Sequence, residues 1–128
     1  MAKRVLAVDD DPSILELERV ILAQDGFEVL TATSAKDALQ KLQAEPVDLM
    51  LLDVVMPDMD GFELCRQIKA DVRFKGLPVI FLTARGGDEA LAEGFESGGV
   101  MYIRKPFTAA KLLAVVGTLL KTGEHGLV

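Results

Sequence analysis

Short apolar runs alternate along the chain with stretches in which apolar residues recur every three or four positions. The runs occupy residues 5–8, 27–31, 47–52, 79–83 and 100–103. The lengths of these runs are typical of buried strands. In the stretches between the runs, apolar residues recur every three or four positions, as at Ile14, Leu17 and Ile21, and this period is typical of amphipathic helices. Five strand–helix pairs in alternation predict right-handed crossovers. The expected fold class is therefore α/β, a doubly wound parallel sheet with helices on both faces.

Residues suited to cap helices precede most of the predicted helices. The candidate N-caps are Asp11 with Pro12 after it, Ser34 with Asp37, Asp60 with Glu63, and Thr108. Each offers a side-chain oxygen to backbone N–H groups that have no partner in the first turn. The fourth helix, expected near residues 88–95, is weakly apolar and contains Gly94, so we expect it to be the least stable. The fifth, expected over residues 109–120, is strongly apolar.

Polar side chains stand at the carboxyl ends of four of the five predicted strands. They are Asp9 and Asp10 after the first strand, Asp53 after the third, Thr83 at the end of the fourth and Lys105 after the fifth. In open α/β sheets, ligands bind at this edge. Three carboxylates would repel one another unless a divalent cation lies among them. The cation and the lysine together would bring the charge close to balance, which suits a site that then accepts a phosphoryl group.

Each of these residues also has an ordinary structural role open to it. The acidic run of residues 9–11 is compatible with an exposed turn, in which Asp11 serves only as a helix cap. Thr83 and Lys105, taken singly, are compatible with a strand-end residue and a solvated charge. The functional interpretation depends on all of them meeting at one edge of the sheet.

The composition fits one small domain and excludes some partners. The chain has 128 residues and a formal net charge of −6. Nucleic-acid binding usually requires a basic surface, so we expect no direct nucleic-acid contact by this domain. A single cysteine, Cys65, leaves no internal disulfide, and no apolar run approaches the roughly 20 residues of a membrane span. We expect a cytoplasmic domain over residues 1–121, with residues 122–128 as a flexible tail or the start of a linker.

The motifs at the strand ends resemble those of the receiver domain of two-component response regulators, along nearly the whole chain. They are Val8-Asp9-Asp10, Leu52-Asp53 with Met56-Pro57 and Asp60-Gly61, Leu82-Thr83-Ala84, and Lys105-Pro106-Phe107. Each motif is weak alone, but the four in this order are specific. The resemblance implies a flavodoxin-like (βα)5 sheet with the strand order 2-1-3-4-5, as in chemotaxis regulators.

The resemblance also implies how a phosphoryl group would be taken up. Asp53 would accept it from the phosphohistidine of a sensor histidine kinase or a phosphotransfer protein. The phosphoryl oxygens would then contact the Lys105 ammonium, the Thr83 hydroxyl and the backbone of Ala84.

A metal ion is the second element that the resemblance implies. Mg²⁺, or Mn²⁺ in its place, would be held by Asp9, Asp10, Asp53 and the backbone carbonyl of Val55. Carboxylate and carbonyl oxygens are the ligands that Mg²⁺ prefers.

By the same resemblance, the domain would be a signalling switch and not an enzyme with a separate substrate. It would catalyse only its own phosphorylation and slow dephosphorylation. Phosphorylation would draw Thr83 inward and let Tyr102 turn inward, which reshapes the face formed by the fourth helix, fifth strand and fifth helix. That face would bind an output protein or a fused output domain that the sequence does not identify, and it is the candidate surface for a homodimer.

Two features near the motifs are particular to this chain. Val55, two residues after Asp53, cannot orient an attacking water, so we expect the aspartyl phosphate to hydrolyse slowly. The fifth helix carries more apolar residues than a narrow stripe holds, namely Leu112, Leu113, Val115, Val116, Leu119 and Leu120. We expect some of them to be exposed to a partner. Met101 and its neighbours either lengthen the fifth strand or add apolar surface to the same face.

Three other functions remain open from the sequence. A degenerate receiver would bind partners without phosphorylation, although the acidic residues, the threonine and the lysine of the motifs are all present. An enzyme of the haloacid dehalogenase type also uses an aspartyl nucleophile and Mg²⁺, but that family needs a second aspartate where Val55 stands. A flavodoxin-like cofactor domain would bring a flavin phosphate against the acidic residues 9–11, which repel it, and no Gly-rich loop follows the first strand.

Overall fold

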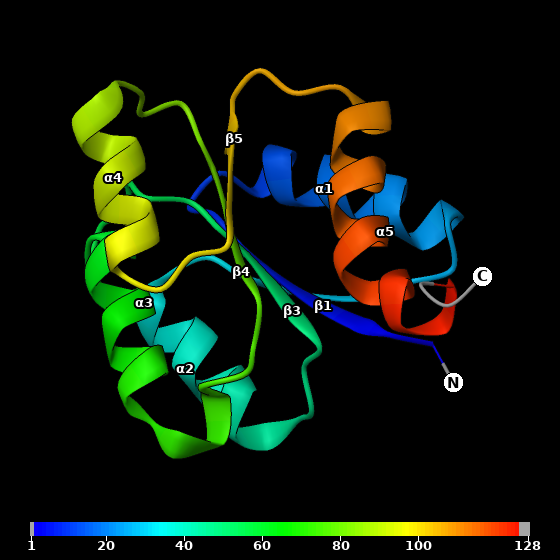
Figure 1. Cartoon of the computed structure of the whole chain (residues 1–128), viewed down its shortest axis with the longest axis horizontal. Coiled ribbons are helices and arrows are strands. Elements are labelled where there is room, and N and C mark those ends of the chain that lie inside the picture. Colours follow the sequence, from blue (N-terminus) through cyan, green and yellow to red (C-terminus); the bar gives the residue numbers. More distant parts are fainter. Residues whose placement is uncertain (1, 126–128) are drawn as a thin grey trace.

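The described part of the chain forms five strands and five α-helices in strict alternation (Figure 1). The structure is a computed structural model that describes residues 2–125. The strands are β1 (Arg4–Val8), β2 (Glu28–Ala32), β3 (Leu49–Leu52), β4 (Val79–Thr83) and β5 (Met101–Arg104). The helices are α1 (Pro12–Gln24), α2 (Ala35–Ala44), α3 (Gly61–Ala70), α4 (Asp88–Glu96) and α5 (Ala109–His125), with a short 3-10 helix η1 (Val72–Phe74) after α3. The predicted strand–helix alternation is therefore confirmed, with boundaries shifted by one or two residues at β1, β2, β3 and β5.

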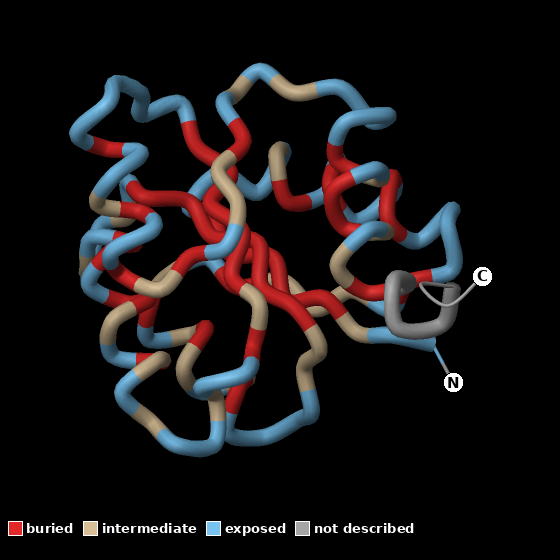
Figure 2. The backbone as a smooth tube through the Cα atoms, viewed as in Figure 1, coloured by how far each residue is buried: buried red, intermediate tan, exposed pale blue. Residues whose placement is uncertain are grey.

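The strands form one parallel sheet in the order β2-β1-β3-β4-β5, which confirms the predicted flavodoxin-like arrangement. Helices α1 and α5 lie on one side of the sheet, and α2, α3 and α4 lie on the other (Figure 1). Every residue of β3 and β4 is buried (Figure 2). Continuous burial is expected of central strands in a sheet that is covered on both faces.

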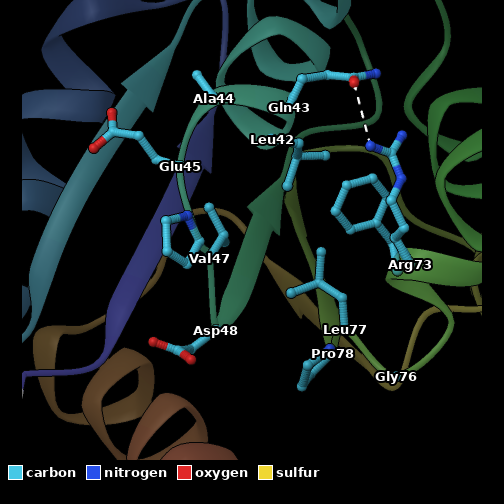
Figure 3. A pocket seen from close by; sticks show the side chains of 12 residues that line it. Leu42, Gln43, Ala44, Glu45, Val47, Asp48, Arg73, Gly76, Leu77 and Pro78 are labelled. Carbon is cyan, nitrogen blue, oxygen red and sulfur yellow. Dashed lines mark hydrogen bonds between the residues drawn. The ribbon is translucent and has the colours of Figure 1, made fainter.

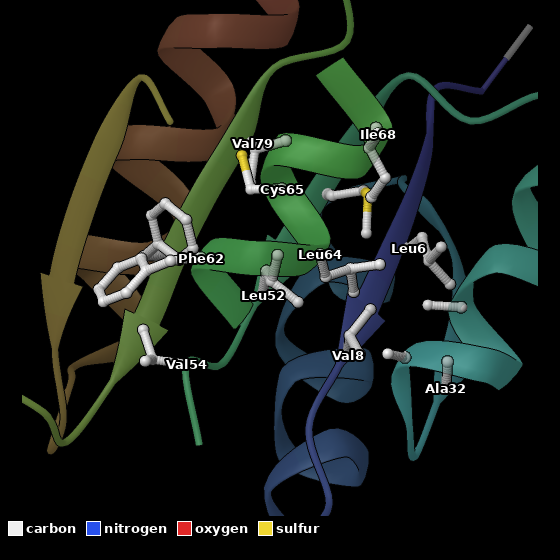
Figure 4. Packing of buried hydrophobic residues seen from close by; sticks show 14 of the residues in the cluster. Leu6, Val8, Ala32, Leu52, Val54, Phe62, Leu64, Cys65, Ile68 and Val79 are labelled. Atoms are coloured by element: carbon white, nitrogen blue, oxygen red, sulfur yellow. The ribbon is translucent and has the colours of Figure 1, made fainter. Parts of the chain in front are cut away.

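The sheet divides the apolar interior into two clusters. On the α2–α3 side, Phe62 meets Phe81 edge to face with ring centroids 5.1 Å apart. Figure 4 shows Leu6, Leu52 and Leu64 of the same cluster packed between the strands and α3. Full burial of one such side chain stabilises the fold by about 1.5–3 kcal/mol. The strand ends are thereby fixed relative to one another, which is what positions the site.

The predicted N-caps are present at four helices. The side chains of Asp11, Ser34, Asp60 and Thr108 accept hydrogen bonds from the backbone N–H groups of Ser13, Asp37, Phe62 and Lys111, at 2.7–3.1 Å. The cap of α3 is formed by Asp60 alone. The Glu63 carboxylate is directed elsewhere and lies 3.8 Å from the Arg66 guanidinium. Helix α4 begins after Gly87 without a side-chain cap.

The apolar residues of α5 are distributed differently from the prediction. Of the six, Leu112, Val115, Val116 and Leu120 are buried, and Leu113 and Leu119 pack partly buried against the same cluster. The expectation that some are exposed is therefore confirmed only in part: none of the six is fully exposed, because α5 packs against α1 and joins the apolar cluster on this side of the sheet. Exposed apolar side chains lie instead on α4, at Leu91 and Phe95, and at Val100 before β5.

The end of the chain bears on the predicted tail. Helix α5 continues to His125, five residues beyond its predicted end, and residues 126–128 lie outside the described residues. The division into a domain at residues 1–121 and a tail at residues 122–128 stays a prediction. Among the helices of residues 2–125, none combines the length and the apolar character needed to cross a bilayer.

Candidate functional site

The carboxyl edge of the sheet gathers three aspartates that are far apart in the sequence. Asp9 and Asp10 follow β1, and Asp53 follows β3, the neighbouring strand. Each can offer one carboxylate oxygen such that the three oxygens all lie within 4.8 Å of one another. This spacing is short enough for a single ion to contact all three.

Backbone pairing holds two of these aspartates in place. The Asp9 N–H donates to the Ala32 carbonyl at 3.1 Å, and the Asp53 N–H donates to the Val8 carbonyl at 3.0 Å. Both side chains are thereby kept at the sheet edge while remaining almost out of solvent, with Asp9 2% and Asp53 6% exposed. Asp10, next to Asp9, is exposed, so the cluster opens to solvent on one side.

Lys105 reaches the cluster from the end of β5. Its Nζ lies 2.5 Å from Asp9 Oδ2 and 3.1 Å from Asp53 Oδ2. Its backbone N–H donates to the Thr83 carbonyl at 2.9 Å, and the Lys105–Pro106 peptide is cis. Burial lowers the pKa of the Lys105 ammonium, but the contacts with Asp9 and Asp53 outweigh burial, and the pKa is raised overall.

The electrostatics of the cluster favour a further cation. Burial raises the pKa of the Asp9 carboxyl above its ordinary value, and the hydrogen bond from Lys105 only partly opposes this effect. One ammonium thus faces three carboxylates. The donors are all oxygen atoms of carboxylates, which fits a hard cation such as Mg²⁺ better than a thiophilic metal.

Thr83 and Tyr102 are connected through the backbone of Arg85. The Arg85 N–H donates to the Thr83 hydroxyl oxygen at 3.2 Å, and the Tyr102 hydroxyl donates to the Arg85 carbonyl at 2.7 Å. Thr83 is fully buried, whereas Tyr102 is half-buried beside Gly94 of α4. The aromatic ring therefore lies beside α4, at the α4–β5 surface.

The glycine of the Asp60-Gly61 motif is required by space. A Cβ atom at position 61 would lie 2.3 Å from the Asp53 carbonyl oxygen, closer than real Cβ contacts come. The Gly61 N–H also donates to the Val54 carbonyl at 2.7 Å. The start of α3 thus packs directly on the backbone that carries Asp53.

The structure brings together Asp9, Asp10, Asp53 and Lys105 as the sequence predicts, with Thr83 at the neighbouring strand end. Val55 borders the site, because its N–H donates to Asp53 Oδ1 at 3.3 Å, and its side chain is exposed. The predicted ligand role of the Val55 carbonyl and the phosphate contact of the Ala84 backbone stay predictions.

Sequence reasoning missed one charged residue near the site. Glu18 of α1 is only 2% exposed, and its carboxyl interacts electrostatically with Asp9, Lys105 and Asp53. The signal was present, since Glu18 lies three residues from both Leu15 and Ile21, on the apolar face of α1. A carboxylate on that face is an exception to helical patterning.

A hollow of about 610 Å³ lies at the opposite, amino edge of the sheet. It is lined by the segments before β3 and β4, with Arg73 donating a 3.4 Å hydrogen bond to Gln43 (Figure 3). None of the predicted site residues lines it.

Comparison with known proteins identifies related chains over nearly the whole length. The family described as Response regulator receiver domain matches residues 5–117. The DNA-binding response regulator MtrA of Mycolicibacterium smegmatis is 36% identical over 124 residues, which are 97% of this chain and 53% of MtrA. This chain thus spans about half the length of that relative.

Two solved structures match the fold closely. A CheY-like receiver domain protein from Methanospirillum hungatei has a TM-score of 0.90 at 32% identity, covering 98% of this chain and 99% of that one. The BeF3-activated receiver domain of DrrB, a Thermotoga maritima protein, has a TM-score of 0.86 at 36% identity, covering 94% and 99%.

Proposed function

Because the chain belongs to the receiver domain family of two-component response regulators, we propose that it is a phosphorylation switch with Asp53 as the phosphoacceptor. Receiver domains are signalling domains. The observation that carries the proposal is the convergence of the Asp9, Asp10 and Asp53 carboxylates within 4.8 Å, with the Lys105 ammonium on Asp9 and Asp53. The BeF3-activated form of the related DrrB domain supports it further.

The transfer step follows from the positions of these groups. A carboxylate oxygen of Asp53 attacks the phosphorus of a phosphohistidine on a sensor kinase or phosphotransfer protein. The new P–O bond forms as the P–N bond breaks, and the donor imidazole leaves with the electron pair and takes a proton from solvent. Lys105 pairs with the phosphoryl oxygens, and the Thr83 hydroxyl and the Ala84 backbone complete the contacts. The catalytic work is positioning and charge neutralisation.

The acidic cluster would hold Mg²⁺, or Mn²⁺, through Asp9, Asp10 and Asp53, together with the Val55 carbonyl. When bound, the ion would neutralise charge on the carboxylates and on the transferring phosphoryl group. Asp9 and Lys105 would keep Asp53 oriented toward the open side of the cluster, where Asp10 is exposed.

The switch is the second part of the proposal. When the Thr83 hydroxyl turns toward the phosphoryl group, it leaves the Arg85 N–H, and the β4–α4 loop is released. The Arg85 carbonyl holds the Tyr102 hydroxyl, so the same movement frees Tyr102 to turn inward. Phosphorylation acts by favouring one of two existing conformations, to the extent of its differential affinity for them.

The surface that changes is formed by α4, β5 and α5. Leu91 and Phe95 of α4 are 41% and 49% exposed there and stand one helical turn apart. They offer apolar contacts to an output protein, to an output domain of a longer chain, or to a second copy of this chain. A sensor histidine kinase or phosphotransfer protein is the expected donor.

Labelling with acetyl phosphate and Mg²⁺ tests the proposal. We expect an acid-stable, base-labile phosphoryl label on the wild-type protein and none on Asp53→Asn. Asp11→Asn is the matched control, because it removes the same charge beside the cluster while asparagine still caps α1. It should label normally. The decay of the wild-type label also measures the slow hydrolysis expected from Val55. A labelled Asp53→Asn variant would contradict the assignment, and no label on the wild type would favour a degenerate, partner-binding receiver.

A further inference from the structure

The loop that follows Asp53, between β3 and α3, is tied to a different helix by one side chain. Both carboxylate oxygens of Asp58 accept hydrogen bonds from the start of α2. Oδ1 accepts from the Ala35 N–H and Oδ2 from the Lys36 N–H, each at 3.0 Å. The partners are 23 and 22 residues away in the sequence. The contact therefore joins the segment beside the phosphoacceptor to a helix that carries none of the predicted site residues.

This contact completes the amino end of α2. The first four N–H groups of a helix have no partner within it. Ser34 meets two of them, because its hydroxyl oxygen accepts from the Asp37 N–H at 3.1 Å and its carbonyl from the Ala38 N–H at 3.0 Å. The other two are the N–H groups that Asp58 binds. Helix α2 is thus capped by its own serine and by a carboxylate from the β3–α3 loop.

The contact is strong for one made by an exposed side chain. A carboxylate is favoured at the positive end of a helix, and hydrogen bonds to a charged acceptor are roughly twice as strong as those between neutral groups. The bonds from Ala35 and Lys36 lower the pKa of the Asp58 carboxyl below its ordinary value, so the carboxylate is charged at neutral pH. Because Asp58 is exposed, replacing it leaves no cavity and isolates the loss of the contact.

The same loop carries the main chain that borders the site. The Val55 N–H donates to Asp53 Oδ1 at 3.3 Å. The Gly61 N–H donates to the Val54 carbonyl at 2.7 Å, which closes the loop on itself. Asp58 lies three residues after Val55, inside this closed loop. The position of the Val55 main chain therefore depends on an anchor that is close to it in the chain.

We propose that Asp58 is a positioning residue for the phosphoacceptor site: its contact with α2 fixes the β3–α3 loop and so keeps the Val55 main chain beside Asp53. With the contact in place, the Val55 N–H stays on Asp53 and its carbonyl, the proposed Mg²⁺ ligand, is restricted to one position. Without it, part of the free energy of ion binding is used to order the loop. The inference rests on the proposed function of Asp53 as the phosphoacceptor.

Amide hydrogen exchange, followed by NMR without Mg²⁺ or phosphoryl donor, tests the positioning directly. Asp58→Ala removes both bonds, and we expect the Val55 N–H to exchange on the order of tenfold faster. Asp58→Asn keeps one acceptor oxygen and should lie between this variant and the wild type. Ser34→Ala is the matched control, because it removes a hydrogen bond from the same end of α2 but outside the loop. It should speed exchange at the Asp37 N–H and leave Val55 unchanged.

The Mg²⁺ affinity of the unphosphorylated protein gives the second readout, measured by NMR titration. We expect Asp58→Ala to weaken binding on the order of tenfold, as loss of the outer partners of a metal site does. Labelling by acetyl phosphate should slow by a similar factor at low Mg²⁺ and recover most of its rate at saturating Mg²⁺. Ser34→Ala should bind and label as the wild type does. A general loss of helix stability would affect both variants alike.

The inference is overturned if Asp58→Ala leaves either the Val55 exchange rate or the Mg²⁺ affinity at the wild-type value. An equal loss of affinity in Ser34→Ala would overturn it as well. Failure of the proposed function looks different, because then Asp53 of the wild type takes no label at any Mg²⁺ concentration, while the difference in Val55 exchange between the variants persists.

Discussion

At the carboxyl edge of the sheet Asp9 and Asp53 are buried and carboxylates are in excess, whereas at the amino edge the charged side chains are paired and more open to solvent. Asp9 and Asp53 share the single ammonium of Lys105. At the other edge the Arg4 guanidinium lies 2.8 Å from Glu28 and 3.7 Å from Glu45.

This difference in charge balance distinguishes an edge that can bind a cation from an ordinary solvated surface. A balanced, solvated pair has little to gain from a further ion. Three crowded carboxylates gain a great deal from one. The 610 Å³ hollow lies at the balanced edge (Figure 3), so the hollow and the crowded carboxylates are at opposite ends of the sheet.

The sharpest way to break this comparison is to remove one cation from each edge. Lys105→Met leaves the Asp9 and Asp53 carboxylates buried without their ammonium, and loss of one partner of a buried pair costs about 3 kcal/mol or more. We expect that loss in the free energy of unfolding, measured in urea without Mg²⁺, and a partial recovery when Mg²⁺ is added. Arg4→Met is the control and should change stability little, because its ion pairs are exposed. Equal losses at both edges would contradict the contrast.

The next test removes a carboxylate from the crowded edge. Asp10 is exposed and contributes little packing, so Asp10→Asn should leave stability within about 0.5 kcal/mol of the wild type. We expect Mg²⁺-dependent labelling to fall by on the order of 10²-fold or more, since even the outer partners of metal ligands contribute 10- to 100-fold. Labelling rates across a Mg²⁺ titration measure it. An unchanged Mg²⁺ dependence would exclude Asp10 as a ligand.

A smaller effect distinguishes the backbones of the two edges. Gly61→Ala would press a methyl group against the Asp53 carbonyl oxygen, and we expect a loss of about 1–3 kcal/mol together with slower labelling. Gly76 lines the hollow at the amino edge, and a Cβ there meets nothing within 4 Å. Gly76→Ala should be neutral or stabilising by up to about 1 kcal/mol. Urea unfolding of both variants gives the comparison.

The fold was predictable because the relevant signals are local. Buried parallel strands appear as uninterrupted apolar runs, and Asp11, Ser34, Asp60 and Thr108 mark helix starts through bonds that span two or three residues. The convergence of the acidic residues and Lys105 also followed, because the carboxyl ends of parallel strands share one edge.

The features that the sequence did not predict depend on which helix faces are covered by neighbouring elements, and the periodicity of apolar residues does not reveal this. Most of the apolar residues of α5 are buried because that helix packs on α1 as well as on the cluster that covers this side of the sheet. Leu91 and Phe95 are exposed because α4 turns only one side toward the sheet, where Ala90 and Gly94 are buried. Glu18 was overlooked because a charge in a helix is ordinarily assigned to the solvent face.

The two hydrogen bonds at Arg85 have a consequence for how this domain can vary. Both use main-chain atoms, the N–H toward Thr83 and the carbonyl toward Tyr102. The Arg85 side chain can therefore be replaced by another without breaking either hydrogen bond. Such a replacement would remove only side-chain contacts such as the ion pair with Asp60. Proline alone among the common residues lacks the N–H and would cut the connection.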